Sequence, residues 1–123
     1  MLEPVKTVEY YQKDPAPKLF SAGETIFTTG DIEEILYGVV EGVVELWVDG
    51  KLAETIQKGD IFGEGALVHE DKTRFETAIA KTDCQLAYIG RQHFLFVVQQ
   101  TPMFALEVIK SYSDRLRRVK QCL

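Results

Sequence analysis

The sequence is poor in the residues on which several classes of protein depend. Its 123 residues include only two cysteines, Cys84 and Cys122, too few for a disulfide framework, so we expect a reducing, cytoplasmic setting. The longest apolar run, Phe94 to Val98, has five residues, whereas a membrane-spanning helix needs about 20. The first 20 residues contain three acidic side chains and no apolar stretch, so they do not resemble a secretory signal. These absences argue against membrane and secreted proteins.

Groups that could perform catalysis are also scarce. Histidine occurs twice, and we expect His93, beside the apolar face of a predicted helix, to be structural. His69 lies in an acidic loop, and no second histidine or cysteine pair has the spacing of a metal site. There is no nucleophile elbow, Walker lysine or paired-cysteine motif. The sequence therefore predicts no catalytic residue and no metal site, and Cys84, which alternates with Leu86 and Tyr88, is expected in the core.

The net charge of −5 conceals an uneven distribution along the chain. Residues 1–101 carry 9 basic and 17 acidic side chains, whereas residues 102–123 carry 5 basic and 2 acidic side chains. An acidic body repels nucleic acid, and one basic segment is more typical of a solvated helix face than of a DNA-binding element. We therefore expect no direct contact with nucleic acid.

Short apolar stretches dominate residues 18–90, with turn residues between them about every eight to twelve positions. The strongest turn signal is Asp49-Gly50, which favours a two-residue hairpin. The expected strands are Leu19–Ala22, Thr25–Thr28, Ile35–Val40, Val43–Val48, Leu52–Ile56, Ile61–Phe62, Phe75–Ala80 and Cys84–Ile89. Such regular short strands predict a sandwich, a jelly roll or a barrel.

The period of the apolar residues changes to that of a helix after Gly90. Residues 92–100 predict a first helix, and Thr101-Pro102 predicts an N-cap and the first position of a second helix that runs to the C-terminus. Residues 1–17 contain three prolines and predict an arm or a short helix. We therefore divide the chain into an arm and one domain, residues 18–123, with a β-roll at 18–90 and helices at 91–123.

The second predicted helix carries an apolar seam with spacings of four and three residues, as in a coiled coil. The seam consists of Ala105, Ile109, Tyr112, Leu116, Val119 and Leu123. This stripe must be buried, either against the chain's own β-roll or against a second copy, and we expect a homodimer through this helix. In that arrangement we expect the neighbouring basic side chains in solvent: Arg115, Arg117, Arg118 and Lys120.

One segment, residues 59–80, could form a site for an anion. Gly63 and Gly65 allow close approach of the backbone, and Ala66 can begin a short helical turn whose N–H groups attract negative charge. Arg74 offers a planar donor fork that suits a phosphate, and Glu64 could accept hydrogen bonds from sugar hydroxyls. A GxG motif with a nearby arginine is common, so these residues alone do not identify the ligand.

A longer series of motifs resembles a known family. The segments FSAGETIF, the GD of TTGD, LYGVVEG, the DG hairpin, KGDIFGEGAL, the arginine at 74 and KTDCQLAYI have the order and spacing of cyclic nucleotide-binding domains, with a loop length similar to the catabolite-activator branch. The resemblance implies a mainly β fold, an eight-stranded β-roll (a double-stranded β-helix or jelly roll) with flanking helices and a long C-terminal helix. It also implies that Glu64 holds the ribose 2′-hydroxyl, while Arg74 and the amides of Gly65 and Ala66 hold the cyclic phosphate of cyclic AMP or cyclic GMP.

The sequence departs from the family pattern in three places. The family has small residues after its arginine, whereas Phe75 and Glu76 occupy these positions here. Alternate residues of a strand share a face, so we expect Glu76 to lie beside Arg74 and to occupy the phosphate site. Val119 and Lys120 replace the small hydroxyl residues that contact the base in the catabolite-activator branch. The sequence also ends where transcription factors of the family add a helix-turn-helix domain.

These observations support one preferred function and two alternatives. We expect a stand-alone regulatory module with weak or lost affinity for cyclic nucleotides, whose ligand biases the C-terminal helix and through it a separate protein partner. The first alternative is a degenerate domain that serves as an interaction or dimerisation unit without a nucleotide. The second is an enzyme of the cupin type, for which the sequence lacks a cluster of histidine and glutamate ligands. The candidate ligand-binding residues are Gly63, Glu64, Gly65, Ala66, Arg74, Phe75 and Glu76.

Overall fold

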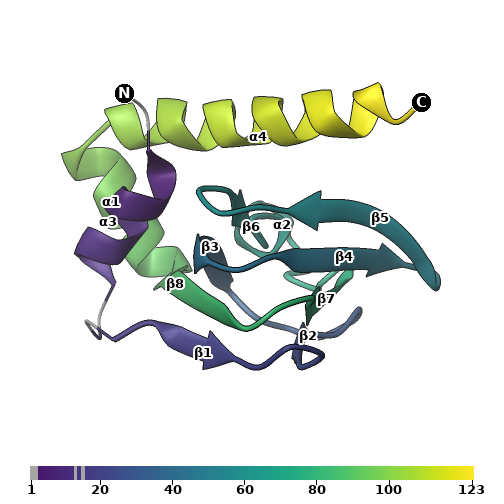
Figure 1. The fold of residues 1–123 in the computed structure, drawn as a ribbon. Coiled ribbons are helices and arrows are strands. Elements are labelled where there is room, and N and C mark those ends of the chain that lie inside the picture. The colour runs from purple at the N-terminus through teal and green to yellow at the C-terminus, as the bar shows by residue number, and fades with distance from the viewer. Residues whose placement is uncertain (1–2, 13, 15) are drawn as a thin grey trace.

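The structure is a computed structural model that describes residues 3–12, 14 and 16–123. The strands in these residues are β1 (Lys18–Phe20), β2 (Thr25–Phe27), β3 (Ile35–Glu41), β4 (Val44–Val48), β5 (Lys51–Ile56), β6 (Ile61–Phe62), β7 (Thr77–Ala80) and β8 (Cys84–Gly90). The helices are α1 (Pro4–Tyr11), α2 (Gly65–Val68), α3 (Arg91–Gln100) and α4 (Met103–Gln121). The eight strands form two antiparallel sheets, in the orders β1-β8-β3-β6 and β2-β7-β4-β5 (Figure 1). The expected β-roll with flanking helices and a long C-terminal helix is confirmed.

Most element boundaries differ from the predicted ones by one or two residues, and two of these differences have a clear local reason. Strand β7 begins at Thr77, because Phe75 and Glu76 form a bend and the ladder with β4 starts at the Trp47–Thr77 pair. The strand alternation that was expected to place Glu76 beside Arg74 therefore does not apply to these residues. At the other end of the chain, the N-cap of α4 is Pro102 and not Thr101, and it makes no side-chain capping bond.

The inside of the roll is filled by side chains that alternate along the strands. Among the residues that the structure describes, twelve buried ones form this cluster, and Cys84 is one of them as predicted. Phe27, Tyr37 and Phe62 stack inside it, with ring centroids 5.5 to 6.2 Å apart. Such aromatic contacts contribute more than their buried area alone. Phe27 and Tyr37 of this stack also lie under the guanidinium of Arg74, which belongs to the loop at residues 73–76, called the cassette loop below.

A second cluster joins the helices to the roll. Val5 and Val8 of α1, Val97 of α3 and Phe104 of α4 pack with residues of β3, β6 and β8. Figure 1 shows α1 and α3 at the end of the roll where α4 begins. Together these helices position the first turns of α4 against the roll.

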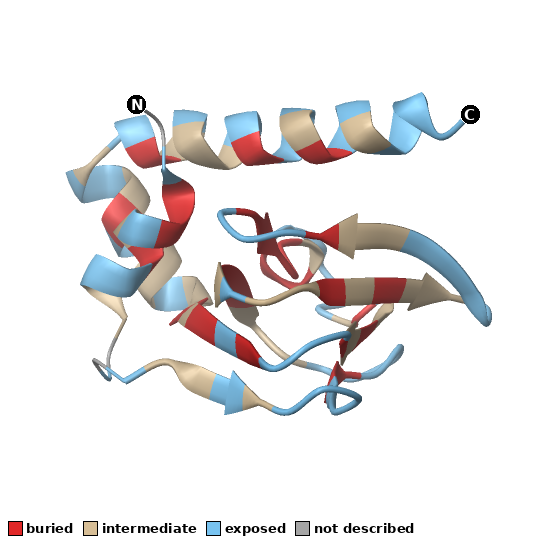
Figure 2. Cartoon of the chain, viewed as in Figure 1, coloured by how far each residue is buried: buried red, intermediate tan, exposed pale blue. Residues whose placement is uncertain are grey.

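Helix α4 has two different faces. Its inward face continues from Phe104 through Val108 and Ser111 to Arg115, and Figure 2 shows its buried residues on the side towards the roll. The Ser111 hydroxyl accepts a hydrogen bond of 3.2 Å from the Ile61 amide. No helix in the described residues is both long enough and apolar enough to span a lipid bilayer. The inward face thus docks α4 on β6, next to the candidate site.

Candidate functional site

The predicted ligand-binding residues line one cavity of about 310 Å³. The cavity lies between α2, the loop at residues 73–76, β5 and the middle of α4. All seven residues singled out from the sequence border it: Gly63, Glu64, Gly65, Ala66, Arg74, Phe75 and Glu76. The structure adds Phe27, Glu54, His69, Thr73, Tyr112 and Arg115 to the lining. The sequence therefore located the cavity, but it missed the wall that α4 contributes.

The glycine at position 63 is required by the close approach of Arg74. Gly63 has a φ of +81°, and a Cβ atom there would lie 2.8 Å from Arg74 Nη1. Positive φ is unfavourable for residues with a side chain, so glycine removes both the backbone strain and the clash. This is the physical reason for the first glycine of the FGEG motif.

Arg74 is buried, and both of its terminal nitrogens donate hydrogen bonds inside the roll, whereas Nε has no partner in the described residues. Its side chain is 2% exposed, and the guanidinium carbon lies 4.1 Å from the centre of the Phe27 ring. Nη1 donates to the carbonyl of Gly63 at 2.7 Å, and Nη2 donates to the carbonyl of Ile35 and to Glu33 Oε1, each at 2.7 Å. The carboxylate that holds Arg74 is therefore that of Glu33, and the expectation that Glu76 provides it is wrong.

Glu33 reaches Arg74 through the loop before β3. An isolated bridge pairs Ile32 with Thr73, and this places the two chain segments side by side. The Tyr37 hydroxyl donates to the same Glu33 oxygen at 2.9 Å. Burial, followed by the charge of Glu33, raises the pKa of Tyr37. Tyr37 therefore remains protonated and helps to hold the Glu33 carboxylate against Arg74.

Arg115 was expected in solvent, and this expectation is wrong. It is 5% exposed and crosses from α4 into the cavity. Nε and Nη2 donate to the two carboxylate oxygens of Glu54 at 2.7 and 2.9 Å. Nη1 donates to Glu64 Oε1 at 2.8 Å and to the carbonyl of Ile61 at 3.0 Å. The glutamate that was expected to hold a ribose hydroxyl is thus already bound to a side chain of α4.

Arg118 was also expected in solvent but is partly buried and paired with Asp60, whereas Arg117 and Lys120 are exposed. The signal for the inward face was present in the sequence. Phe104, Val108, Ser111 and Arg115 follow one another at spacings of four, three and four residues, which is the spacing of one helix face. Ser111 and Arg115 made this inward face hard to predict, because hydroxyl and charged side chains normally indicate a helix face in solvent.

Glu76 is half-buried in the same cavity. In the described residues its carboxylate has no hydrogen bond or ion pair, and the guanidinium groups of Arg74 and Arg115 form ion pairs with other carboxylates. Burial and the charge of Glu64 raise the pKa of Glu76. Counting Glu33, four carboxylates surround two guanidinium groups at this site, so its electrostatic balance is unfavourable for an anion.

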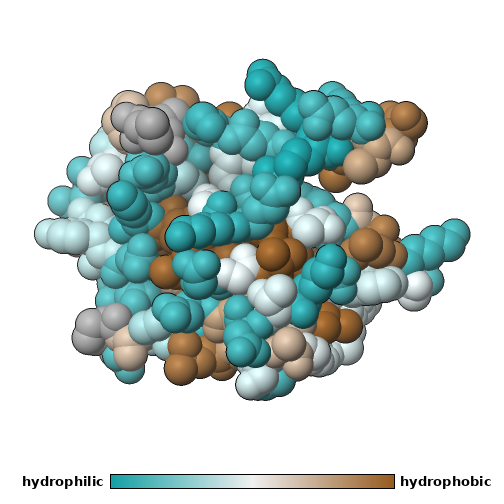
Figure 3. All heavy atoms as spheres, in the orientation of Figure 1, coloured by the Kyte–Doolittle hydropathy of each residue, from teal (hydrophilic) through white to brown (hydrophobic). Residues whose placement is uncertain are grey.

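The apolar seam of α4 is mostly exposed to solvent. Ile109 and Leu116 are 61% and 52% exposed, and Tyr112, Val119 and Leu123 are also exposed, whereas Ala105 is partly buried. Tyr112 in addition borders the cavity, where the Arg115 guanidinium lies 5.2 Å from its ring centre. Figure 3 shows hydrophobic side chains at the C-terminal end of the helix, above the β4–β5 hairpin. The β-roll therefore leaves most of the seam uncovered, although Tyr112 and Val119 line cavities that the roll borders.

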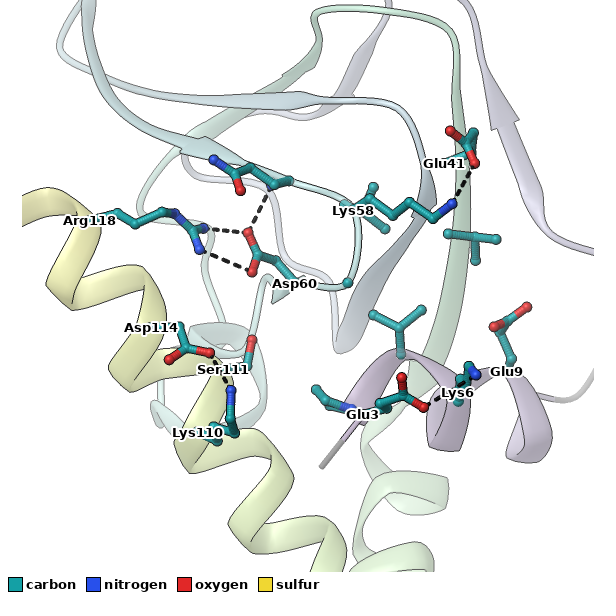
Figure 4. A pocket seen from close by; sticks show the side chains of 16 residues that line it. Glu3, Lys6, Glu9, Glu41, Lys58, Asp60, Lys110, Ser111, Asp114 and Arg118 are labelled. Atoms are coloured by element: carbon teal, nitrogen blue, oxygen red, sulfur yellow. Dashed lines mark hydrogen bonds and ion pairs between the residues drawn. The ribbon is translucent and has the colours of Figure 1, made fainter. Parts of the chain in front are cut away.

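A larger cavity, of about 560 Å³, lies between α1, α4 and the turn before β6 (Figure 4). None of the residues predicted for ligand binding lines it. Apart from Glu9, its charged side chains pair with one another: Lys110 with Asp114, Lys58 with Glu41, Lys6 with Glu3 and Arg118 with Asp60. Paired charges leave little to attract a charged ligand, so we place the candidate site at the smaller cavity.

Comparison with known proteins gives a family match. The model of the family described as "Cyclic nucleotide-binding domain" matches residues 17–101. A cAMP-dependent protein kinase regulatory subunit of Eremothecium gossypii is 38% identical over 77 residues, which cover 63% of this chain and 17% of the relative. The cyclic AMP receptor protein of Thermus thermophilus is 29% identical over 115 residues, which cover 89% of this chain and 51% of the relative. The chain thus spans about half or less of these two curated relatives.

Solved structures share the fold. A structure of the c-di-GMP-responsive global regulator CLP of Xanthomonas campestris matches with a TM-score of 0.80 at 20% identity, over 96% of this chain and 60% of that one. At this identity the match concerns the arrangement of the β-roll and its helices.

Proposed function

The chain belongs to the cyclic nucleotide-binding domain family, and we propose that it is a regulatory binding module with weak affinity for cyclic AMP or cyclic GMP. The observation that carries this proposal is that both arginines of the pocket are bound to internal carboxylates, Arg74 to Glu33 and Arg115 to Glu64. A ligand must displace these carboxylates before it can use the same groups. We propose a binding role and no catalysis, in keeping with the scarcity of catalytic groups.

The ligand would use the residues that match the family motif. Arg74 and the first amides of α2, those of Gly65 and Ala66, would bind the cyclic phosphate, and Glu64 would bind the ribose. Phe75 and Glu76 stand at the mouth of this site in place of small residues and reduce affinity further. A phosphate beside Glu76 meets a like charge, which weakens binding unless that charge is removed.

The same geometry supports a regulatory role for α4. Arg115 and a ligand hydroxyl would share the Glu64 carboxylate, so a ligand that draws this carboxylate towards itself weakens one of the contacts that dock α4 on the roll. A ligand shifts a conformational equilibrium by its difference in affinity for the two states. We therefore propose that α4 passes the binding signal to a partner protein.

Isothermal titration calorimetry with cyclic AMP and cyclic GMP tests this proposal. We expect weak or undetectable binding by the wild type, and measurable binding by a variant with Phe75→Ser and Glu76→Ala. Adding Arg74→Ala to that variant should abolish binding again. Glu70→Ala is the matched control, because it removes one charge from an exposed position of the neighbouring loop. Submicromolar binding by the wild type would contradict the proposed weakness.

The exposed seam of α4 supports a homodimer, and this also suits the alternative of a dimerisation unit without nucleotide. A stripe with Ile109 and Leu116 more than half exposed loses contact with water when a second copy covers it. We expect a dimer for the wild type in light scattering and a monomer for Leu116→Glu. Gln121→Glu adds the same charge away from the seam and should leave the dimer intact. A dimer with no cyclic nucleotide binding in any variant would favour the alternative.

A further inference from the structure

The charge of the pocket suggests a condition for ligand binding that goes beyond a weak affinity. The groups that face Glu76 are Glu64 before α2, His69 at its end, Glu54 of β5, Arg74 of the cassette loop, and Tyr112 and Arg115 of α4. Arg115 is shared between Glu54 and Glu64, and Arg74 is held by Glu33. Both guanidinium groups near Glu76 are thus paired with other carboxylates, so the Glu76 carboxylate has no ion-pair partner of its own in the described residues.

We propose that the pocket binds an anionic cyclic nucleotide together with a proton, and that Glu76 is the group that takes up this proton. The inference rests on the proposed function, because it concerns the ligand of the same cavity. A cyclic phosphate diester keeps its single negative charge between about pH 5 and pH 8, so the ligand itself cannot supply the neutralisation. One carboxyl group of the pocket must do so.

The hydrogen bonds decide which carboxyl group accepts the proton. Glu54 accepts two bonds from Arg115 and Glu64 accepts one, and bonds from a guanidinium favour the ionised carboxylate. Glu33 is held by Arg74 and Tyr37, and its side chain is 28% exposed, so it can turn towards water when a phosphate displaces it. Glu76 accepts no such hydrogen bond in the described residues, so its protonation breaks none and costs the least free energy of the four carboxylates.

The surroundings of Glu76 already favour the protonated form before a ligand enters. Burial and the charges of Glu64 and Glu54 raise its pKa, while Arg115 and Arg74 lower it only in part. A phosphate anion close by raises the pKa further. At pH values between the pKa of Glu76 in the free protein and its higher pKa in the complex, ligand binding is accompanied by uptake of a proton. The affinity for the ligand therefore increases as the pH falls. The module would then respond fully to a cyclic nucleotide only in an acidified compartment.

Calorimetry of cyclic AMP and cyclic GMP binding from about pH 5 to about pH 8 tests the inference. For the wild type we expect affinity to fall with rising pH by up to about tenfold per pH unit. Glu76→Gln should bind with an affinity that is independent of pH and exceeds that of the wild type at neutral pH. Glu70→Gln, an exposed neighbour, should retain the wild-type slope.

His69 needs its own control, because a charged imidazole at the pocket would also favour an anion at low pH. We expect His69→Gln to keep the wild-type slope. A slope that disappears in His69→Gln, or that persists in Glu76→Gln, would overturn the assignment to Glu76. Titrations in buffers with different ionisation enthalpies should show proton uptake by the wild type and none by Glu76→Gln.

The outcomes separate this inference from the proposed function. Binding that is independent of pH in the wild type overturns the inference and leaves the proposed function in place. An absence of binding in the wild type, in Glu76→Gln and in the Phe75→Ser, Glu76→Ala variant at every pH overturns both. A carbon-13 NMR titration of the ligand-free protein provides a second test, and a Glu76 carboxyl that titrates together with the exposed glutamates overturns the inference alone.

Discussion

The two ends of the candidate pocket each contain a buried arginine, and the two arginines are held in different ways. Arg74 bonds to the carbonyls of Gly63 and Ile35 and to Glu33, so its partners all belong to the roll and the loops that connect its strands. Arg115 belongs to α4 and bonds to groups of the roll. A movement of α4 would leave Arg74 in place and remove Arg115. The Arg74 end of the pocket is therefore held within the β-roll itself, whereas the Arg115 end depends on the docking of α4 on the roll.

The two ends also differ in their exposure to water. The side chains of Glu54 and Glu64 are 14% and 11% exposed, whereas that of Glu33 is 28% exposed. A less hydrated carboxylate depends more on its arginine, because water cannot replace the lost partner. We therefore expect the contacts at Arg115 to matter more for stability and those at Arg74 to matter more for ligand binding.

Arg115→Met should have the largest effect on stability. It leaves two buried carboxylates and the Ile61 carbonyl without their donor, and the loss of one partner from a buried ion pair costs about 3–5 kcal/mol. Chemical denaturation measures this change. Lys110→Met is the control, because its pair with Asp114 is exposed and should contribute less than about 1 kcal/mol. Equal losses in the two variants would contradict the structural role of Arg115.

Arg74→Met should destabilise the protein less. The carbonyls of Gly63 and Ile35 lose a donor, which costs about 1–3 kcal/mol, while Glu33 can turn to solvent. The same denaturation experiment compares the variant directly with Arg115→Met. A loss of stability at Arg74 that exceeds the loss at Arg115 would reverse the comparison between the two ends.

Gly63→Ala should disturb the Arg74 end alone. A positive φ costs a residue with a side chain about 1–2 kcal/mol, and the new methyl group would also press on Arg74 Nη1. Gly23→Ala is the matched control, since Gly23 has a φ of +90° and nothing within 4 Å of the added Cβ. The difference in unfolding free energy between the two variants isolates the contact with Arg74, and no difference would argue against it.

Glu76→Gln should have the smallest effect, and its sign should depend on pH. Burial and the charge of Glu64 raise the pKa of Glu76 in the folded state, so the folded protein holds this proton more tightly than the unfolded chain. The stabilisation of the folded protein that results from this tighter proton binding is complete at low pH and is lost as the pH rises through the pKa of Glu76 in the folded state. Melting temperatures should therefore match the wild type in acid and exceed it at neutral pH. A variant that is less stable at neutral pH would show that the charged form of Glu76 is favourable.

Local patterns in the sequence were sufficient to predict the roll and seven of the residues that line the candidate cavity. Alternating apolar residues, turn residues such as Asp49-Gly50 and the change of period after Gly90 predicted the strands and helices to within a few residues. The candidate ligand-binding residues lie between Gly63 and Glu76, so a short stretch of chain is enough to bring them together. Both results depend on interactions between residues that are close in the sequence.

Tertiary structure decided which charges pair. Arg74 and Glu33 are 41 positions apart, and Arg115 and Glu64 are 51 positions apart, so no local pattern links them. The sequence by itself determined the strands, the helices and the segment from Gly63 to Glu76, because these follow from side-chain periodicity and from the conformational freedom of glycine. The packing of α4 on β6 decided that Arg115 pairs with Glu64, and the packing of the loop before β3 on residues 73–76 decided that Arg74 pairs with Glu33. The sequence does not show these pairs, because a charged side chain is buried only where folding brings it an opposite charge.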